Sequence, residues 1–211
     1  MTDLSSFPQQ AGRERAAHVA LALVAIVATV VFVAAPSYRK LVGYGLYAIP
    51  AHLLISFLPH EPALLYVAKE YAPALLATTG TLACVVAAIL DYWLIGWFVG
   101  QGLIRSKLDD SRIFRIAQRI FNKAPFLLIA GSALAPVPFY PVKIIAIACG
   151  YSLPLFITAV VAGRWPRFYL IAIGGREFQA PNSWLLGAAI VLEVAAVIGI
   201  WRTRRQSRKA V

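Results

Sequence analysis

A long apolar run, from about Leu153 to Gly174, carries two arginines near its middle, Arg164 and Arg167. A helix rises about 1.5 Å per residue, so a helix that enters a lipid bilayer at Leu153 brings Arg164 to about the middle of the bilayer. A cation at that depth costs several kcal/mol unless it is paired or lies in a wet cavity. The run therefore predicts either a site for an anion inside the membrane or a structural ion pair with a buried carboxylate.

The composition indicates an integral membrane protein. Of the 211 residues, 60% are hydrophobic and 14% are charged, whereas a soluble domain has about 25% charged residues. The net charge of +11 would suggest nucleic acid as the partner of a soluble protein. Because the basic residues flank apolar segments here, we expect anionic membrane lipids as partners and no nucleic acid. The sequence is also compatible with a homo-oligomer.

No residue pattern indicates an enzyme or a cofactor. The sequence has none of the motifs of zinc hydrolases, serine hydrolases or phosphate-binding loops. Cys84 and Cys149 lie in apolar segments, and we interpret them as small buried hydrophobic residues. We interpret His52 and His60 as packing or hydrogen-bonding residues rather than ligands. We therefore expect no catalytic residue, no metal and no cofactor.

The hydropathy pattern divides the chain into three parts. Residues 1–16 are polar, residues 17–201 form one membrane domain, and residues 202–211 form a strongly basic tail. Within the membrane domain, four apolar segments are long enough to span the hydrocarbon. These segments are residues 17–35, about 72–100, about 153–174 and about 183–201, with a turn expected at Gly174-Gly175 between the last two.

Two further apolar segments, 43–62 and 125–150, are interrupted by prolines. Proline removes a helical hydrogen bond, and irregular backbone is tolerated at membrane depth only where it is buried in protein or lines a wet cavity. We therefore expect each segment to form a re-entrant hairpin of two short helices. The helix-breaking residues are Pro59 and Pro62 in the first segment and Pro136 and Pro138 in the second.

The pattern of residues 104–122, which lie between the two proline-interrupted segments, predicts a basic amphipathic helix at the membrane surface. Arg112, Arg115 and Arg119 recur at helical spacing, and isoleucines recur on another face. Such a helix buries its apolar face in the interface and leaves its cations among the headgroups. A soluble connector with solvated charges is the alternative.

The distribution of basic residues predicts the orientation. With a cytoplasmic N-terminus and hairpins that do not cross, the cytoplasmic side holds two basic residues before residue 17, six from Arg105 to Lys123 and five in the tail, and the other side holds four. The positive-inside rule therefore places both termini in the cytoplasm. One hairpin then enters from each side and precedes a full span, as in an inverted repeat. The predicted fold is an all-α integral membrane protein with about four transmembrane helices and two oppositely oriented re-entrant hairpins.

Five charged residues form the candidate site. Arginine presents a planar fork that suits phosphate oxygens, so we expect Arg164 and Arg167, with Lys143, to bind a phosphate headgroup. A carboxylate in a low dielectric holds a proton more readily and can load and release it, so Glu61 and Asp91 are candidates for proton coupling. The alternative is a set of structural ion bridges, for example Asp91 with Arg164.

Together these residues resemble the DedA/VTT-domain superfamily of membrane proteins over about residues 50–175. The order and spacing of several short motifs carry the resemblance. They are Pro59-His60-Glu61, Asp91-Tyr92 followed by Gly96 and Gly100, Pro136-Val137-Pro138, Gly150, Phe156 and Gly163-Arg164-Trp165-Pro166-Arg167. The resemblance implies paired re-entrant helices and a lipid-handling role, since bacterial members include flippases of undecaprenyl phosphate or phospholipid and eukaryotic relatives are scramblases. It also implies that Glu61 and Asp91 match acids used in proton-dependent function.

The chain departs from the bacterial pattern of that superfamily at the second hairpin. The arginines common beside its proline motif are absent, because Leu134 and Ala135 precede Pro136. Lys143 is a candidate replacement for a missing arginine.

The sequence thus predicts a flippase- or scramblase-like transporter of lipids with anionic phosphate headgroups, with a proton-coupled step, in a bacterial inner membrane. Two alternatives stay open. The first is a proton-coupled ion or small-solute antiporter that uses Glu61 and Asp91. The second is a non-transporting membrane assembly protein whose basic helix and tail bind partners.

Overall fold

The computed structural model describes residues 29–53, 58–100, 112–135, 139–179 and 181–187, with isolated positions on either side. These residues are almost entirely helical and include no strand, which confirms the all-α class for this part of the chain. The elements are η2 (Pro36–Tyr38), α2 (Arg39–Ala51), α3 (His60–Ala68), α4 (Pro73–Gly100), α6 (Arg112–Lys123), α7 (Pro125–Leu134), α8 (Tyr140–Ala148) and α9 (Leu153–Phe178).

Two helices are long and apolar enough to cross a membrane, Pro73–Trp97 within α4 and Leu153–Phe178, which is α9. They coincide with the second and third predicted spans. The first and fourth predicted spans, 17–35 and 183–201, are described only in part, and the basic tail lies outside the described residues. The predicted surface helix is described only from Arg112 onward, where it forms α6.

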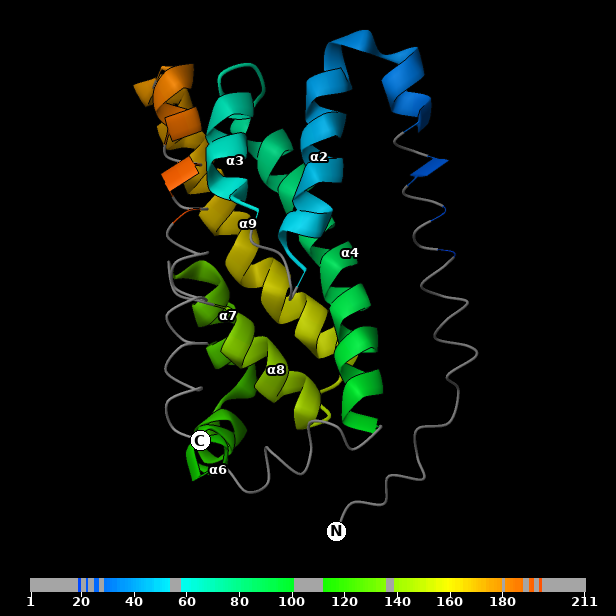
Figure 1. Cartoon of the computed structure of the whole chain (residues 1–211), viewed down its shortest axis with the longest axis vertical. Coiled ribbons are helices and arrows are strands. Elements are labelled where there is room, and N and C mark those ends of the chain that lie inside the picture. Colours follow the sequence, from blue (N-terminus) through cyan, green and yellow to red (C-terminus); the bar gives the residue numbers. More distant parts are fainter. Residues whose placement is uncertain are drawn as a thin grey trace.

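The order of short helix, short helix and long helix occurs twice along the chain, first as α2, α3 and α4 and then as α7, α8 and α9. Figure 1 shows α2 and α3 in the upper half of the bundle and α7 and α8 in the lower half, with α9 running obliquely between them. The two pairs of short helices therefore occupy opposite ends of the bundle.

The break in the first pair ends at Pro59, whose backbone is extended (φ −76°, ψ 100°) immediately before α3. Pro62 lies inside α3, in the first turn, where a helix does not use the backbone N–H that proline lacks. Pro62 thus does not interrupt the helix. Pro136 and Pro138 lie outside the described residues.

Helix α9 continues through Gly174 and Gly175, where the sequence suggests a turn before the last span. It ends at Phe178, and Gln179 follows in the left-handed conformation (φ 40°) with its N–H bonded to the Gly175 carbonyl. A Cβ at Gly175 would lie 2.9 Å from Leu65 Cδ2 and 3.0 Å from Ala68 Cβ. This glycine therefore allows α9 to approach α3 closely rather than ending the helix.

The two halves pack together through their long helices, α4 and α9, and through the second short helix of each pair. Helix α2 packs on α4 and α7 packs on α9, within their own halves, whereas α3 packs mainly on α9 and α8 packs on α4. Fully buried side chains such as Phe156 and Phe168 fill the centre of this arrangement. Side chains from both halves consequently meet in one interior region.

Candidate functional site

Asp91 and Lys143 form a buried ion pair in that region. Lys143 Nζ lies 2.5 Å from Asp91 Oδ2, and the two side chains are 4% and 1% exposed. The ammonium also donates to the backbone carbonyl of His52, 3.0 Å away, at the end of α2. Lys143 thus links α8 to α4 and to the end of α2.

Glu61 and Arg167 form a second ion pair, between Arg167 Nη2 and Glu61 Oε1. Arg167 Nη1 donates to the carbonyl oxygen of Ala135, 2.5 Å away, just beyond the end of α7. The Glu61 side chain is 39% exposed and the Arg167 side chain 13%. This pair therefore lies nearer the surface than the Asp91–Lys143 pair.

The two ion pairs connect helices of different halves that also pack on each other, α4 with α8 and α3 with α9. Both acids come from the first half of the chain, Glu61 on α3 and Asp91 on α4, and both bases come from the second half. Each pair joins the second short helix of one half to the long helix of the other. The sequence suggested Asp91 with Arg164 as an example of a structural bridge, but the structure places Lys143 against Asp91.

Arg164 is the remaining cation. It is only 8% exposed and lies one helical turn before Arg167 on α9. Its guanidinium carbon lies 5.3 Å from the centre of the Phe139 ring and 5.9 Å from that of Phe168. Among the described residues, no side chain or carbonyl forms an ion pair or hydrogen bond with it. Among the residues that the structure describes, three cations thus share this region with two carboxylates.

Aromatic contacts alone do not offset the burial of that charge. A cation over an aromatic ring gains about 0.5–2 kcal/mol, whereas an unpaired buried ion costs several kcal/mol. An anion beside Arg164 would balance the excess positive charge. The arrangement therefore suits an anionic ligand that reaches the middle of α9.

Several buried polar atoms also lack a hydrogen-bond partner in the described part of the chain. They are the Tyr44 hydroxyl, His52 Nε2, His60 Nε2 and Thr81 Oγ1. The two imidazole rings lie 4.2 Å apart and contact the Phe168 ring at 5.7 and 6.0 Å between centroids. Arg164 interacts electrostatically with both imidazoles. Unpartnered polar atoms of this kind are uncommon in protein interiors and call for a ligand or water.

The sequence did not assign these histidines to the site. Their positions do carry a signal, because His52 follows the last residue of α2 and His60 is the first residue of α3, so that they flank the helix break.

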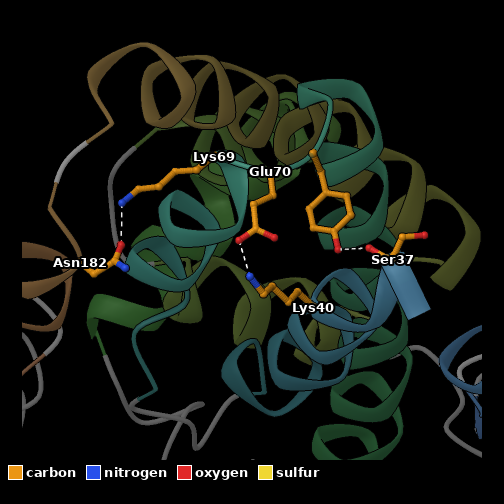
Figure 2. Close-up of polar contacts among 6 residues, drawn as sticks. Ser37, Lys40, Lys69, Glu70 and Asn182 are labelled. Carbon is orange, nitrogen blue, oxygen red and sulfur yellow. Dashed lines mark hydrogen bonds and ion pairs between the residues drawn. The ribbon is translucent and has the colours of Figure 1, made fainter. Parts of the chain in front are cut away.

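A separate group of polar contacts fastens the outer ends of α2 and α3 (Figure 2). Lys40 Nζ lies 2.5 Å from Glu70 Oε1, the Tyr71 hydroxyl donates to the Ser37 carbonyl at 2.5 Å, and Lys69 Nζ donates to Asn182 Oδ1 at 2.7 Å. The hydrogen bond to Glu70 raises the pKa of Lys40 above its ordinary 10.5. All these groups are exposed, so we assign them a structural role.

An apolar cavity of about 270 Å³ lies between α3 and α9. Its lining residues are Leu65 on α3 and Lys69 just after it, Ile171, Gly174, Gly175 and Phe178 on α9, and Leu185. Leu65 follows Glu61 by one helical turn, and Ile171 follows Arg167 by one turn. The cavity therefore begins next to the outer ion pair.

No group of three or more His, Cys, Asp or Glu side chains that could hold a metal occurs among the described residues. Comparisons with protein-family models, with curated proteins and with solved structures gave no significant match.

Proposed function

We propose that this protein is a flippase- or scramblase-like transporter of lipids with anionic phosphate headgroups, and that Arg164 is the first residue to bind the headgroup. One observation carries the proposal. A guanidinium in the middle of a membrane-length helix is buried without a counter-ion among the described residues. Guanidinium matches phosphate oxygens with two parallel hydrogen bonds.

The two other residues proposed to bind the headgroup, Lys143 and Arg167, are each paired with a carboxylate of the chain. Lys143 is held by Asp91, and Arg167 is held by Glu61. Because the outer pair is partly exposed, a phosphate can compete with Glu61 for Arg167 at a lower cost than it can compete for Lys143. The headgroup thus moves from Arg167 to Arg164, while Lys143 stays with Asp91.

The apolar cavity favours a lipid over a small solute. It adjoins the Glu61–Arg167 pair and is lined by hydrocarbon from α3 and α9. A lipid whose headgroup contacts Arg167 could place part of its chain there, with the burial of apolar surface adding to the binding free energy. A small-solute antiporter has no use for such a cavity.

The finer topology belongs to the same proposal. It comprises about four spans, re-entrant hairpins formed by α2–α3 and by α7–α8, cytoplasmic termini, a bacterial inner membrane and membership of the DedA/VTT superfamily. The repeated helix order and the opposite placement of the two short-helix pairs (Figure 1) support it. Labelling of single cysteines from each side of the membrane tests it. The tip of a re-entrant hairpin should stay unlabelled from the side opposite to the one where the hairpin begins and ends.

Transport in reconstituted liposomes tests the function. The protein should move fluorescent phosphatidylglycerol or polyprenyl phosphate between leaflets, and Arg164→Gln should slow this movement about tenfold or more. Arg176→Gln is the matched control, because Arg176 is an exposed arginine near the end of the same helix. No movement of any anionic lipid by the unsubstituted protein would overturn the proposal, as would full activity of Arg164→Gln. Proton flux without lipid movement would favour the antiporter.

A further inference from the structure

His52 has a defined protonation state in the empty protein. The residue is 7% exposed, and its Nδ1 lies 2.6 Å from the carbonyl oxygen of Ala48, one turn earlier on α2. A carbonyl oxygen only accepts hydrogen bonds, so Nδ1 carries the ring proton. Neutral His52 therefore presents a bare lone pair at Nε2, and this atom has no partner among the described residues.

Charged and titratable groups approach this interior from every helix around His52. They are Tyr44 from α2, His60 and Glu61 from α3, Cys84 and Asp91 from α4, Lys143 from α8, and Arg164 and Arg167 from α9. Both carboxylates are paired with cations. In contrast, His52 has no carboxylate partner in the described part of the chain, and its ring interacts with the charge of Arg164.

The charge of Arg164 decides when His52 can hold a second proton. While the site is empty, an imidazolium would add one more cation to a buried region that already has an excess of positive charge. An anion beside Arg164 cancels that excess and offers an acceptor for an Nε2–H donor. His60, whose ring lies 4.2 Å from that of His52, stays neutral because two adjacent imidazoliums would repel each other.

We propose that His52 takes up a proton at Nε2 when an anion with phosphate-type oxygens binds beside Arg164, so that anion binding is coupled to uptake of one proton. The proton comes from solvent and forms the Nε2–H bond, while Nδ1–H stays bonded to Ala48. The imidazolium then donates to an oxygen of the anion. This inference rests on the proposed function and assigns the proton to His52 instead of Glu61 or Asp91.

Isothermal titration calorimetry of the full chain in detergent measures this uptake. Dihexanoyl phosphatidylglycerol is the lipid probe, since its phosphodiester keeps a fixed charge near neutral pH, and inorganic sulfate is the free-oxyanion probe. Repeating each titration in buffers with different protonation enthalpies gives the number of protons bound per anion. We expect close to one proton per anion for the unsubstituted protein. Binding of sulfate but not of the lipid would overturn the lipid proposal and leave the proton coupling intact.

His52→Asn is the informative variant, because its side-chain amide can still donate to the Ala48 carbonyl but has no group in place of Nε2. It should bind the lipid about tenfold more weakly, a difference of about 1.4 kcal/mol, with no proton uptake. His60→Asn and Glu61→Gln should keep the uptake. Uptake that survives in His52→Asn, or that disappears in Glu61→Gln, would overturn the inference.

The two proposals fail in different ways. Tight binding to the unsubstituted protein without proton uptake would overturn the role of His52 alone, and this measurement needs no variant. Absence of binding, or binding that Arg164→Gln leaves unchanged, would overturn the proposed function.

Discussion

Asp91 on α4 and Lys143 on α8 form a buried ion pair that joins the two halves of the helix bundle. The pair between Glu61 on α3 and Arg167 on α9 makes the reciprocal connection nearer the surface. Because each pair takes its acid from the first half and its base from the second, neither half can satisfy its own buried charges. The centre of the bundle is therefore complete only when both halves are packed together.

Loss of one partner of the inner pair should destabilise the fold strongly. Asp91→Asn leaves Lys143 as a buried cation without its carboxylate, which should lower the free energy of unfolding by about 3–5 kcal/mol. Reversible denaturation in mixed micelles measures this change. The double variant Asp91→Asn with Lys143→Met should recover much of the loss, as a double-mutant cycle would show. A cost no larger than that of Glu70→Gln, whose ion pair is exposed, would contradict the account.

Substitution of Glu61, the acid of the outer ion pair, should lower stability less than substitution of Asp91 does. It should also strengthen the binding of phosphatidylglycerol. Glu61 is 39% exposed and Arg167 keeps its bond to the Ala135 carbonyl, so Glu61→Gln should cost about 1 kcal/mol. The variant also frees Arg167 for a phosphate, so phosphatidylglycerol should bind several-fold more tightly by calorimetry. Weaker binding by this variant would argue against competition between Glu61 and the headgroup.

Two glycines of α9 should respond in opposite ways to alanine. A Cβ at Gly163 would overlap the carbonyl oxygen of Ala130 and lie 2.7 Å from Ala133 Cβ, both on α7. Gly163→Ala should therefore cost about 1–3 kcal/mol through overpacking. Gly174→Ala is the control, since a Cβ there meets nothing within 4 Å, and alanine should gain up to about 1 kcal/mol in a helix. Equal stability of the two variants in the micelle assay would show that α7 and α9 are not so closely packed.

Lys40 should titrate at an unusually high pH. Its pKa is raised by the hydrogen bond to Glu70, so the folded state binds the Lys40 proton more tightly than the unfolded state. The stabilisation from this pair is thus fully present below pH 10.5, the ordinary value, and is lost as the pH rises through the raised pKa. NMR titration of the Lys40 ammonium should show Glu70→Gln returning its pKa toward the ordinary value. An unchanged pKa in the variant would exclude the contact in solution.

The long helices were the easiest part of the fold to predict. Segment 72–100 is strongly apolar, with Asp91 as its one charged residue, and α4 follows it closely. Gly174 and Gly175 gave a misleading signal, because a glycine that permits close packing against α3 looks the same in the sequence as one that ends a helix.

The site was predictable in its residue types but not in its pairing. A charge in an apolar run must be compensated, which singled out Asp91 and Arg164, yet the partner depends on how α8 crosses onto α4. His52 shows the same limit. Its Nδ1 contact within α2 is local, but the absence of a partner for Nε2 among the described residues becomes visible only after the helices are packed.

A structure of the protein in lipid nanodiscs with phosphatidylglycerol tests the central claim most directly, through the distance from the Arg164 guanidinium to the nearest phosphate. The account predicts a lipid phosphate within hydrogen-bonding distance of Arg164. A carboxylate of the chain paired with Arg164 in the presence of lipid, and no phosphate beside it, would contradict the account.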